Sequence, residues 1–586
     1  MPSSERSSGG LGAAESRRTG EVIVAAMGME QRWRCTNYAT GLEAVRGFRH
    51  GQSLLAYPLL RTSSTPVPIP FRKVIQENRH ALLLALLALA TSLGWFFIDG
   101  DVGINLADEG YLWHGTEAMR QGQIPMRDFH AYDPGRYLWT VGWSYLLGES
   151  LVSLRLACVL FQCLGVFAGL LAVCRVSRQP LFLICIALLL DVWMHPRYKV
   201  FEQSIALMSV YAGVLLMERP TLRRHLGVGI FGGLMAFMGR NHGAYHVLAF
   251  GLIISWTAGS EGWREWRRRI MAWSGGLFAG YAPQWLMFIC VPGYFRSFVD
   301  SLVSISAKGT NLAAAVPWPW LVPANLPGWI RANSIAEGCF YVALPLFLAL
   351  AVARACWLGR QRLATQPVLV SAACVTLPYT HYVFSRPDIV HLTHGAPSMV
   401  LGAIALAASF ASRGRWLPRA CAPVILVASV LANFFQLGAI RQLFAPPGTY
   451  LSLPVNGSRM LLQRYHVQVL VSAHTLTTDL AKADEPVFFA PHMPGLYPFT
   501  GRLSPTKQIY FIFPATPDED RALLAEIEKA GVQWVMLHDY ALDGREDLRF
   551  RATNPIVFDF FRKNFEPALI ETLPRDMIVL HRIHHP

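Results

Sequence analysis

Residues 152–173 read VSLRLACVLFQCLGVFAGLLAV, a stretch long and apolar enough to cross the ~30 Å hydrocarbon core of a bilayer as one helix. Similar stretches centre on residues 81–98, 180–194, 203–217, 226–238, 246–258, 270–291, 338–356, 367–384, 395–411 and 421–438. The stretches are nearly free of charge, with Asp191 at the end of the third. The sequence therefore predicts a mainly α, polytopic transmembrane helical bundle of about eleven spans.

The composition of the whole chain agrees with a membrane protein. Of its 586 residues, 53% are hydrophobic and only 15% are charged, whereas a soluble chain carries about 25% charged residues. These values exclude intrinsic disorder, a collagen-like chain and a disulfide-stapled secreted scaffold. The net charge of +14 would suggest nucleic acid on a soluble chain. Here the arginines lie between apolar stretches, so membrane orientation explains them and no nucleic-acid partner is predicted.

The arginines also predict how the chain is inserted. Short loops dense in arginine alternate with longer loops poor in it, and the positive-inside rule assigns the dense loops to the cytoplasm. The dense loops contain Arg175, Arg178, Arg219, Arg223, Arg224, Arg264, Arg267, Arg268, Arg269, Arg360, Arg362, Arg413, Arg415 and Arg419. The arginine-poor loops are 99–151, 195–202, 239–245, 292–337 and 385–394. We predict a multi-pass protein of the inner (plasma) membrane with a cytoplasmic N-terminus and a periplasmic, extracytoplasmic C-terminus.

Composition divides the chain into three predicted parts. Residues 1–79 are polar and basic, lack the apolar core of a cleavable signal peptide, and are expected to form a disordered cytoplasmic tail. Residues 80–440 hold the spans. Residues 441–586 are richer in acidic residues and contain strand patterns at 487–490, 532–537 and 577–580. A helix pattern lies between the first two strands; it begins with a capping box at 516–519 and ends at Gly531. We predict a small extracytoplasmic α/β accessory domain there.

The first arginine-poor loop, residues 99–151, is called loop 1 below. It carries an adjacent pair of carboxylates, Asp108 and Glu109, in the motif Asp-Glu-Gly-Tyr, shortly after the first predicted span. Desolvation at the interface and repulsion from Glu109 would raise the pKa of Asp108, which suits a general base. The alternative is a solvated acidic loop that caps a helix.

Three further motifs follow in loop 1, Gly122-Gln-Ile-Pro, Arg127-Asp128-Phe and Asp133-Pro-Gly. With Asp-Glu-Gly-Tyr they resemble the corresponding loop of the GT-C membrane glycosyltransferases, and most nearly the bacterial branch of protein mannosyltransferases, aminoarabinose transferases and Rgt-like enzymes. The resemblance covers residues 80–400 in topology. It implies a GT-C-like glycosyltransferase domain at 80–440, a polyprenyl-phosphate sugar donor, and a catalytic carboxylate in loop 1. We assign that role to Asp108, with Glu109 as its competitor and Asp128 as a substrate-binding candidate.

A second element that resembles this family opens the fourth span. The family often has an arginine here, followed about five positions later by an acidic residue, and this chain has Arg197 and Glu202. Glu202 departs from the more usual aspartate, which puts its role in doubt. Arg197 and Lys199 suit the phosphate of a lipid-linked donor. The alternative, strongest for Lys199, is that long basic side chains reach to the membrane interface.

Two further polar segments are candidates for substrate binding. Arg240 and His242 lie in Gly-Arg-Asn-His-Gly between spans five and six, which is either a plain turn or polar backbone that protein or a water-filled cavity must satisfy. Arg386, Asp388 and His391 follow span nine in an element that also occurs in some bacterial relatives. Asp388 and His391 are placed to bond each other or the acceptor. A divalent metal is compatible with them, but the spacing matches no recognised metal motif, so no cofactor is predicted.

These features predict an inverting glycosyltransferase that acts at the outer face of the inner membrane. The donor would be a polyprenyl-phosphate sugar, and the acceptor a glycolipid, polysaccharide or protein, with membrane lipids around both. The alternatives are a lipid or polysaccharide transporter, which would show charges within spans and internal repeats, and a lipid-binding protein without chemistry.

Overall fold

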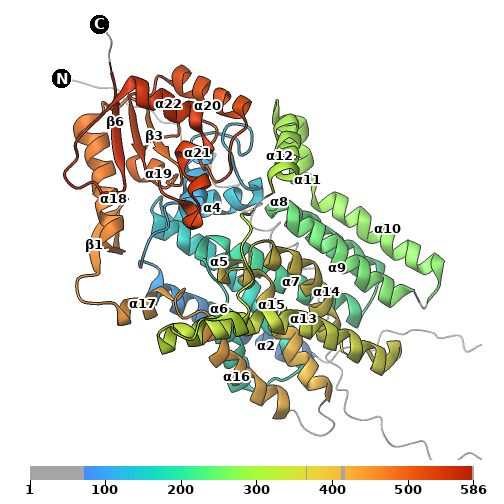
Figure 1. Cartoon of the computed structure of the whole chain (residues 1–586). Helices are drawn as coiled ribbons and strands as arrows, with labels where there is room; N and C mark the ends of the chain where they lie inside the picture. Colours follow the sequence, from blue (N-terminus) through green and yellow to red (C-terminus); the bar gives the residue numbers. More distant parts are fainter. Residues whose placement is uncertain (1–70, 260, 310, 364–365, 411–415, 584–586) are drawn as a thin grey trace, which may run out of the picture. The chain divides into compact units, whose positions relative to one another are not determined.

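The computed structural model describes residues 71–259, 261–309, 311–363, 366–410 and 416–583, and this part of the chain is mainly helical (Figure 1). Backbone contacts separate two units, Met1–Leu84 and Ala85–Pro586. Of the tail predicted at 1–79, residues 1–70 lie outside the described part. Residues 71–79 belong to the helix α2 (Phe71–Asp99), which begins earlier than the apolar stretch at 81–98.

Each of the eleven predicted spans overlaps a helix. These helices are α2, α5 (Leu151–Val173), α6 (Pro180–Val192), α7 (Val200–Glu218), α8 (Leu222–Met238), α9 (Arg240–Ala258), α10 (Trp263–Gly280), α13 (Gly328–Leu363), α14 (Pro367–Ser385), α15 (Ile389–Phe410) and α16 (Trp416–Ala432). Within the described residues, 6 helices are long and apolar enough to cross a membrane, or 7 if one bent pair is a single span, and α6 and α16 are shorter apolar helices. The polytopic helical bundle is confirmed, and the count of eleven stays a prediction.

The predicted span at 270–291 is not one helix. α10 ends at Gly280, α11 (Ala282–Cys290) begins with a proline in its first turn, and α12 (Tyr294–Lys308) leaves α11 at 116°. Pro283 has no backbone N–H with which to continue the hydrogen bonding of α10. Gly293, with a φ of 77°, permits the sharp turn before α12. Two local breakers thus produce a broken or re-entrant span.

Glycines allow α8 and α10 to approach closely. Gly229 and Gly233 on α8 and Gly276 and Gly280 on α10 are each spaced four residues apart. A Cβ at any of them would lie 2.1–2.3 Å from a backbone oxygen of the facing helix. Small residues at this spacing are a common means of packing helices in membranes, where dispersion between close backbones replaces hydrophobic burial.

The C-terminal segment, residues 441–586, forms the predicted α/β structure. A hairpin of β1 (Tyr450–Val455) and β2 (Ser458–Gln463) precedes a four-stranded sheet in the order β3-β4-β6-β5. These strands are β3 (Val487–Ala490), β4 (Trp534–Leu537), β5 (Phe565–Pro567) and β6 (Ile578–Arg582), with β3 parallel to β4 and the other pairs antiparallel. The crossover from β3 to β4 contains α20 (Pro517–Ala530), whose predicted capping box at Thr516 and left-handed Gly531 are both confirmed. α22 (Pro555–Asn564) packs with α20 on the sheet, over a core that includes Phe488, Val535 and Phe561.

The C-terminal segment packs directly on loop 1. The backbone N–H of Gly103 donates to the carbonyl of Leu461 (2.8 Å), and that of Gly495 donates to the carbonyl of Leu106 (3.0 Å). Gly495 also lies against Gly110 in the helix α3 (Asp108–Arg120), where a Cβ on Gly110 would be 2.4 Å from the Gly495 nitrogen. The backbones of the two parts therefore touch beside the predicted catalytic pair.

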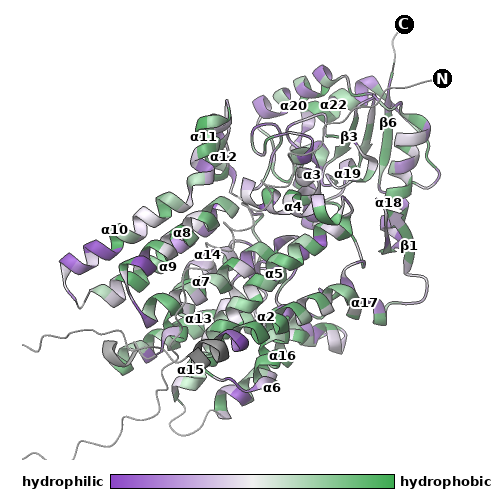
Figure 2. Cartoon of the chain, turned by 180° about the vertical axis from the view of Figure 1, so that it is seen from behind, coloured by the Kyte–Doolittle hydropathy of each residue, from purple (hydrophilic) through white to green (hydrophobic). Residues whose placement is uncertain are grey.

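The arginine-rich end of α10 lies far from this contact. Its four arginines occupy the first two turns of an 18-residue helix, which is about 27 Å long. The other end leads through α11 to α12, whose last residue, Lys308, pairs with Glu519 of the C-terminal segment (2.6 Å). Figure 2 shows the hydrophilic residues of α10 gathered at the end away from α11. The length of α10 thus separates this cluster from the end that leads to α11 and α12, and the orientation of the chain in a membrane stays a prediction.

We predict opposite readouts from reporter fusions placed after Arg269 and after Glu485, because Arg269 lies at the arginine-rich, predicted cytoplasmic end of α10 and Glu485 lies in the predicted extracytoplasmic C-terminal segment. Alkaline phosphatase, which folds only outside the cytoplasm, should be active after Glu485 and inactive after Arg269. Equal activities at the two positions would refute the orientation.

We predict that Gly110→Ala lowers the apparent melting temperature of the purified protein, because the new methyl group meets the backbone of Gly495. Overpacking of this kind costs about 1–3 kcal/mol. Gly142→Ala is the matched control, since Gly142 lies in the helix α4 (Pro134–Leu147) and a Cβ there has nothing within 4 Å. An equal loss in both variants would show that α3 does not depend on this contact.

Candidate functional site

Asp108 is the first residue of α3 and is held by groups from two distant parts of the chain. The hydroxyl of Tyr510 donates to its Oδ1 (3.0 Å), and that of Tyr198 donates to its Oδ2 (3.2 Å). The ammonium of Lys199 lies 3.5 Å from the same Oδ2. Asn105 Oδ1 accepts a bond from the backbone N–H of Asp108 (3.0 Å) and so fixes the start of the helix.

The charges around Asp108 favour its ionised form. Burial opposes ionisation, but the Lys199 ammonium and the hydrogen bonds from Tyr510 and Tyr198 outweigh it, so the pKa of Asp108 lies below its usual value. The expectation that Glu109 raises this pKa is wrong, because the carboxylate of Glu109 forms an ion pair with Arg155 that neutralises its charge. At neutral pH Asp108 is a carboxylate, able to accept a proton.

Glu109 is bound on both oxygens by Arg155. Arg155 Nε and Nη2 lie 2.7 Å from Oε1 and Oε2 in a bidentate pair that is nearly inaccessible to solvent. The same guanidinium donates to the carbonyls of Gly100 (2.8 Å) and Gly103 (2.7 Å). Sequence reasoning missed Arg155, although a lone charge inside the apolar stretch 152–173 is a signal for such a role. The predicted spans are therefore not free of charge, because the span at 152–173 contains the buried Arg155.

A cavity of about 610 Å³ opens beside Asp108. Ala107 and Glu109, on either side of it, line the cavity, and so does Arg197. Its walls come from α2, loop 1, α5, the end of α6, the segment before α7, and residues 436–540. They combine apolar side chains (Trp95, Phe96, Val159, Val192, Leu437 and Val469) with cationic, polar and acidic ones (Arg155, Arg441, His466, Gln162, Asp99, Glu109 and Asp191). Such a cavity suits an amphipathic ligand.

Arg197 and Lys199 lie two residues apart but serve different neighbours. Arg197 lines the large cavity, donates to the carbonyls of Asp99 and Val102, and lies 3.5 Å from the Asp99 carboxylate. Lys199 turns to Asp108 instead. Of the two predicted phosphate ligands, Arg197 therefore lines the cavity and Lys199 contacts the carboxylate of Asp108.

Glu202 and Arg240 fasten loop 1 to the bundle. Glu202 pairs with the buried Arg136 (2.7 Å), which also donates to the carbonyl of Met238 (3.0 Å). Arg240 donates to Asp133 from its backbone N–H (3.1 Å) and from Nε (3.0 Å). The Asp133-Pro-Gly motif is thereby explained, since Asp133 binds Arg240 and the next residue, Pro134, opens α4.

The remaining candidates form a separate group or lie deeper in the bundle. Asp388 accepts bonds from Arg386 (2.9 Å) and His391 (2.8 Å), as the sequence allowed. Burial opposes ionisation of Asp388, but these partners lower its pKa to about 2. Arg386 also reaches Asp543 of the C-terminal segment (2.9 Å). His242 bonds to the hydroxyl of Tyr379 (3.0 Å) and is buried between helices.

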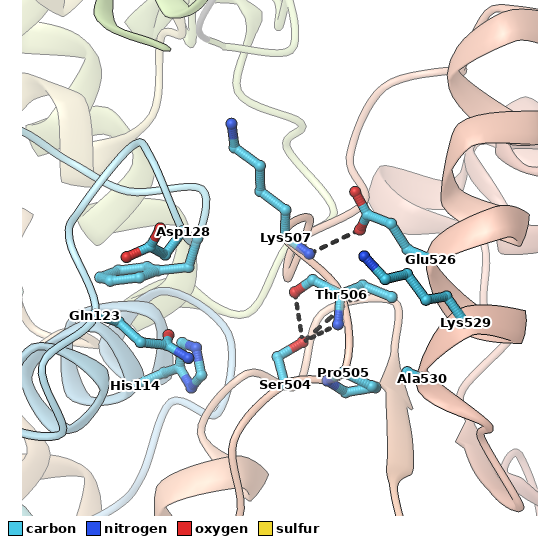
Figure 3. A pocket seen from close by; sticks show the side chains of 11 residues that line it. His114, Gln123, Asp128, Ser504, Pro505, Thr506, Lys507, Glu526, Lys529 and Ala530 are labelled. Atoms are coloured by element: carbon cyan, nitrogen blue, oxygen red, sulfur yellow. Dashed lines mark hydrogen bonds between the residues drawn. The ribbon is translucent and has the colours of Figure 1, made fainter. Parts of the chain in front are cut away.

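Asp128 lies apart from the carboxylate pair. Its oxygens accept bonds from Arg127 (2.7 Å) and from the backbone N–H of Ile124 (2.7 Å), and the bond from Arg127 lowers its pKa. It lines a second pocket, between loop 1 and the C-terminal segment (Figure 3). Among the described residues, no group of three or more His, Cys, Asp or Glu side chains is arranged to hold a metal.

Comparisons with known proteins return distant structural likenesses. No protein-family model and no curated protein sequence matches the chain. Among solved structures, ArnT from Cupriavidus metallidurans bound to undecaprenyl phosphate is 13% identical, with a TM-score of 0.46 over 86% of this chain and 98% of that chain. An oligosaccharyltransferase from Archaeoglobus fulgidus is 11% identical, with a TM-score of 0.43 over 88% and 77% of the two chains. Both are GT-C membrane glycosyltransferases, but likenesses with TM-scores below 0.5 do not assign an activity to this chain.

We predict that Tyr510→Phe moves the acid limb of the pH–activity profile to higher pH. The variant loses a hydrogen bond that favours the charged form, so the pKa of Asp108 rises and the base becomes protonated at a higher pH. A bond to a charged group corresponds to about one pKa unit. The measurement is kcat/KM against pH. Tyr145→Phe, which removes the hydroxyl of an exposed ring on α4, is the control. An unmoved limb in Tyr510→Phe would show that Asp108 does not set the profile.

Proposed function

We propose that this chain is a membrane glycosyltransferase of the GT-C type that moves a sugar from a polyprenyl-phosphate donor to an acceptor hydroxyl at the outer face of the membrane, with inversion. The observation that supports it most is the ionised Asp108 beside Lys199, next to a cavity whose walls are apolar and carry both arginines and carboxylates. A general base, a cation for a phosphate, and room for a lipid are the parts that this reaction needs.

The proposed reaction is a single displacement. Asp108 takes the proton of the acceptor hydroxyl, and the oxygen attacks the anomeric carbon from the face opposite the phosphate. The bond between that carbon and the phosphate oxygen breaks, and the polyprenyl phosphate leaves with the electron pair. Lys199, 3.5 Å from Asp108, is near enough to stabilise the departing charge.

The pairing of the two carboxylates favours Asp108 over Glu109 as the base. Both oxygens of Glu109 already accept charge-assisted bonds from Arg155, and a carboxylate held in this way is a weak and poorly accessible base. Asp108 is bonded by two tyrosine hydroxyls, which an incoming hydroxyl is able to replace without leaving a buried charge unpaired. Glu109 is therefore proposed to hold loop 1 in place.

The cationic candidates differ in how far protein carboxylates already neutralise them. Arg240 is paired with Asp133, and Arg386 with both Asp388 and Asp543. Arg197 and Lys199 each lie 3.5 Å from one carboxylate, that of Asp99 and that of Asp108, which is farther than the pairs of Arg240 and Arg386. Arg197 also donates to two backbone carbonyls and lines the large cavity. We propose Lys199 and Arg197 as phosphate ligands, and Arg386, Asp388 and His391 as a link between the bundle and the C-terminal segment.

The proposed location is the inner membrane, with the site on the periplasmic side. The acceptor is a glycolipid, a polysaccharide or a protein, and the proposal needs no metal. A transporter or a lipid-binding protein without chemistry would keep the cavity but would not depend on the basicity of Asp108.

We predict that Asp108→Asn reduces turnover by about 10²–10⁴-fold, because a positioned base contributes this much. In cells that carry only this variant, the lipid-linked donor should accumulate, as in a deletion strain, and mass spectrometry of extracted polyprenyl phosphates would detect it. Asp101→Asn makes the same substitution in loop 1, away from Asp108, and is the control. If the Asp108→Asn variant had the same lipid profile as the wild type, Asp108 would not be the catalytic base.

Glu109→Gln tests the other member of the pair. It leaves the guanidinium of Arg155 buried without a charged partner, which costs about 3–5 kcal/mol. We expect less folded protein in the membrane, measured by quantitative immunoblot and by melting temperature. A folded Glu109→Gln protein that lacks turnover, beside an active Asp108→Asn protein, would make Glu109 the base.

A further inference from the structure

The second pocket, called the loop 1 pocket here, lies outside the proposed reaction centre. Its volume is about 320 Å³, and Figure 3 shows loop 1 residues on one side and C-terminal residues on the other. Loop 1 contributes His114, Gln123, Asp128 and Phe129, and the C-terminal segment contributes Ser504, Pro505, Thr506, Lys507, Glu526, Lys529 and Ala530. The pocket exists only because the two parts of the chain meet.

The lining balances charge and is rich in hydrogen-bonding groups. The lining carries charges of both signs, from Lys507, Lys529, Glu526 and Asp128, and Asp128 is already paired with Arg127 outside the pocket, so the net charge of the lining is small. The amide of Gln123 adds a donor and an acceptor. The hydroxyls of Ser504 and Thr506 already donate to the carbonyls of Thr506 (2.9 Å) and Gln508 (2.7 Å), so they add acceptors only. Phe129 and Pro505 supply apolar surface. Donors and acceptors beside an aromatic ring suit a polyhydroxylated ligand.

His114 forms part of the wall and has hydrogen-bonding capacity to spare. Its side chain is 1% exposed, and neither ring nitrogen has a hydrogen-bond partner within the protein. Burial lowers its pKa to about 4, so the ring is neutral and offers one donor and one acceptor. A buried polar ring without partners is costly unless something else satisfies it.

The pocket is coupled to the reaction centre by two short stretches of chain. His114 follows Asp108 by six residues on α3, a rise of about 9 Å along the helix. On the other side, Tyr510 follows Lys507 by three residues, about 10 Å if extended. His130 N–H donates to the carbonyl of Lys507 (2.8 Å) and joins the two sides. A ligand in the pocket would therefore lie within the length of a short oligosaccharide from Asp108.

We propose that the loop 1 pocket is a carbohydrate subsite, which holds a sugar at least one residue away from the reacting one in an oligosaccharide substrate. The inference rests on the proposed function and names its substrate class as an oligosaccharide. The sugar belongs either to the acceptor glycan or to a glycan carried by the donor lipid, and the pocket chemistry is the same for both.

The test is binding of the full-length protein, purified in detergent, to an array of bacterial surface glycans from monosaccharides to hexasaccharides. We expect binding to at least one glycan of two or more sugars, and at least tenfold weaker binding by Gln123→Trp, which fills the pocket, and by Lys529→Ala. Gln121→Trp and Lys563→Ala place the same changes on exposed positions outside the pocket and should bind as the wild type does. Size-exclusion chromatography confirms that each variant is folded.

A second arm distinguishes the two sources of the sugar. The same glycans are offered free and coupled to undecaprenyl phosphate. Equal binding of both forms supports an acceptor glycan, and binding only of the coupled form supports a donor glycan. The inference is overturned if the wild type binds no glycan of two or more sugars, or if Gln123→Trp and Lys529→Ala bind as well as their controls. Either result leaves the Asp108→Asn experiment unaffected, so the two proposals fail separately.

Discussion

The buried pair between Glu109 and Arg155 is the interaction on which the rest of the site depends. It lies where α3 meets the start of α5, and Arg155 adds bonds to two carbonyls of loop 1. Removing one partner of a buried pair costs about 3–5 kcal/mol, because the other charge is left unpaired in a medium of low dielectric constant. This single contact therefore fixes where α3 begins, and with it the direction of Asp108.

Two adjacent carboxylates thus have opposite tasks because of their surroundings. Glu109 meets a bidentate guanidinium inside the bundle and is fully satisfied there. Asp108 meets an ammonium and two hydroxyls, from the segment before α7 and from the C-terminal segment. Adjacent residues of a helix point about 100° apart, so one faces α5 while the other faces the C-terminal segment.

The C-terminal segment is more closely involved in the site than an accessory domain needs to be. It supplies the hydroxyl of Tyr510 to Asp108, contacts Gly110 through Gly495, and forms half of the loop 1 pocket. Loop 1 is therefore enclosed between the bundle on one side and this segment on the other. Asp108 is accordingly bonded from both sides, by Tyr198 and by Tyr510.

The sequence by itself determined the helical bundle and the α/β character of residues 441–586, because hydropathy, capping residues and turn residues act over a few neighbours. It also proposed loop 1 as the site, with Asp108, Lys199 and Glu202 among the candidates. Only the tertiary structure decided their partners. The partners lie far away in the sequence: Arg155 is 46 residues from Glu109, Arg136 is 66 residues from Glu202, and Tyr510 is 402 residues from Asp108. A local sequence pattern does not predict contacts over such separations. The direction of the Asp108 pKa shift was misjudged for the same reason, since it depends on which charges the fold brings near and which it removes by pairing them elsewhere.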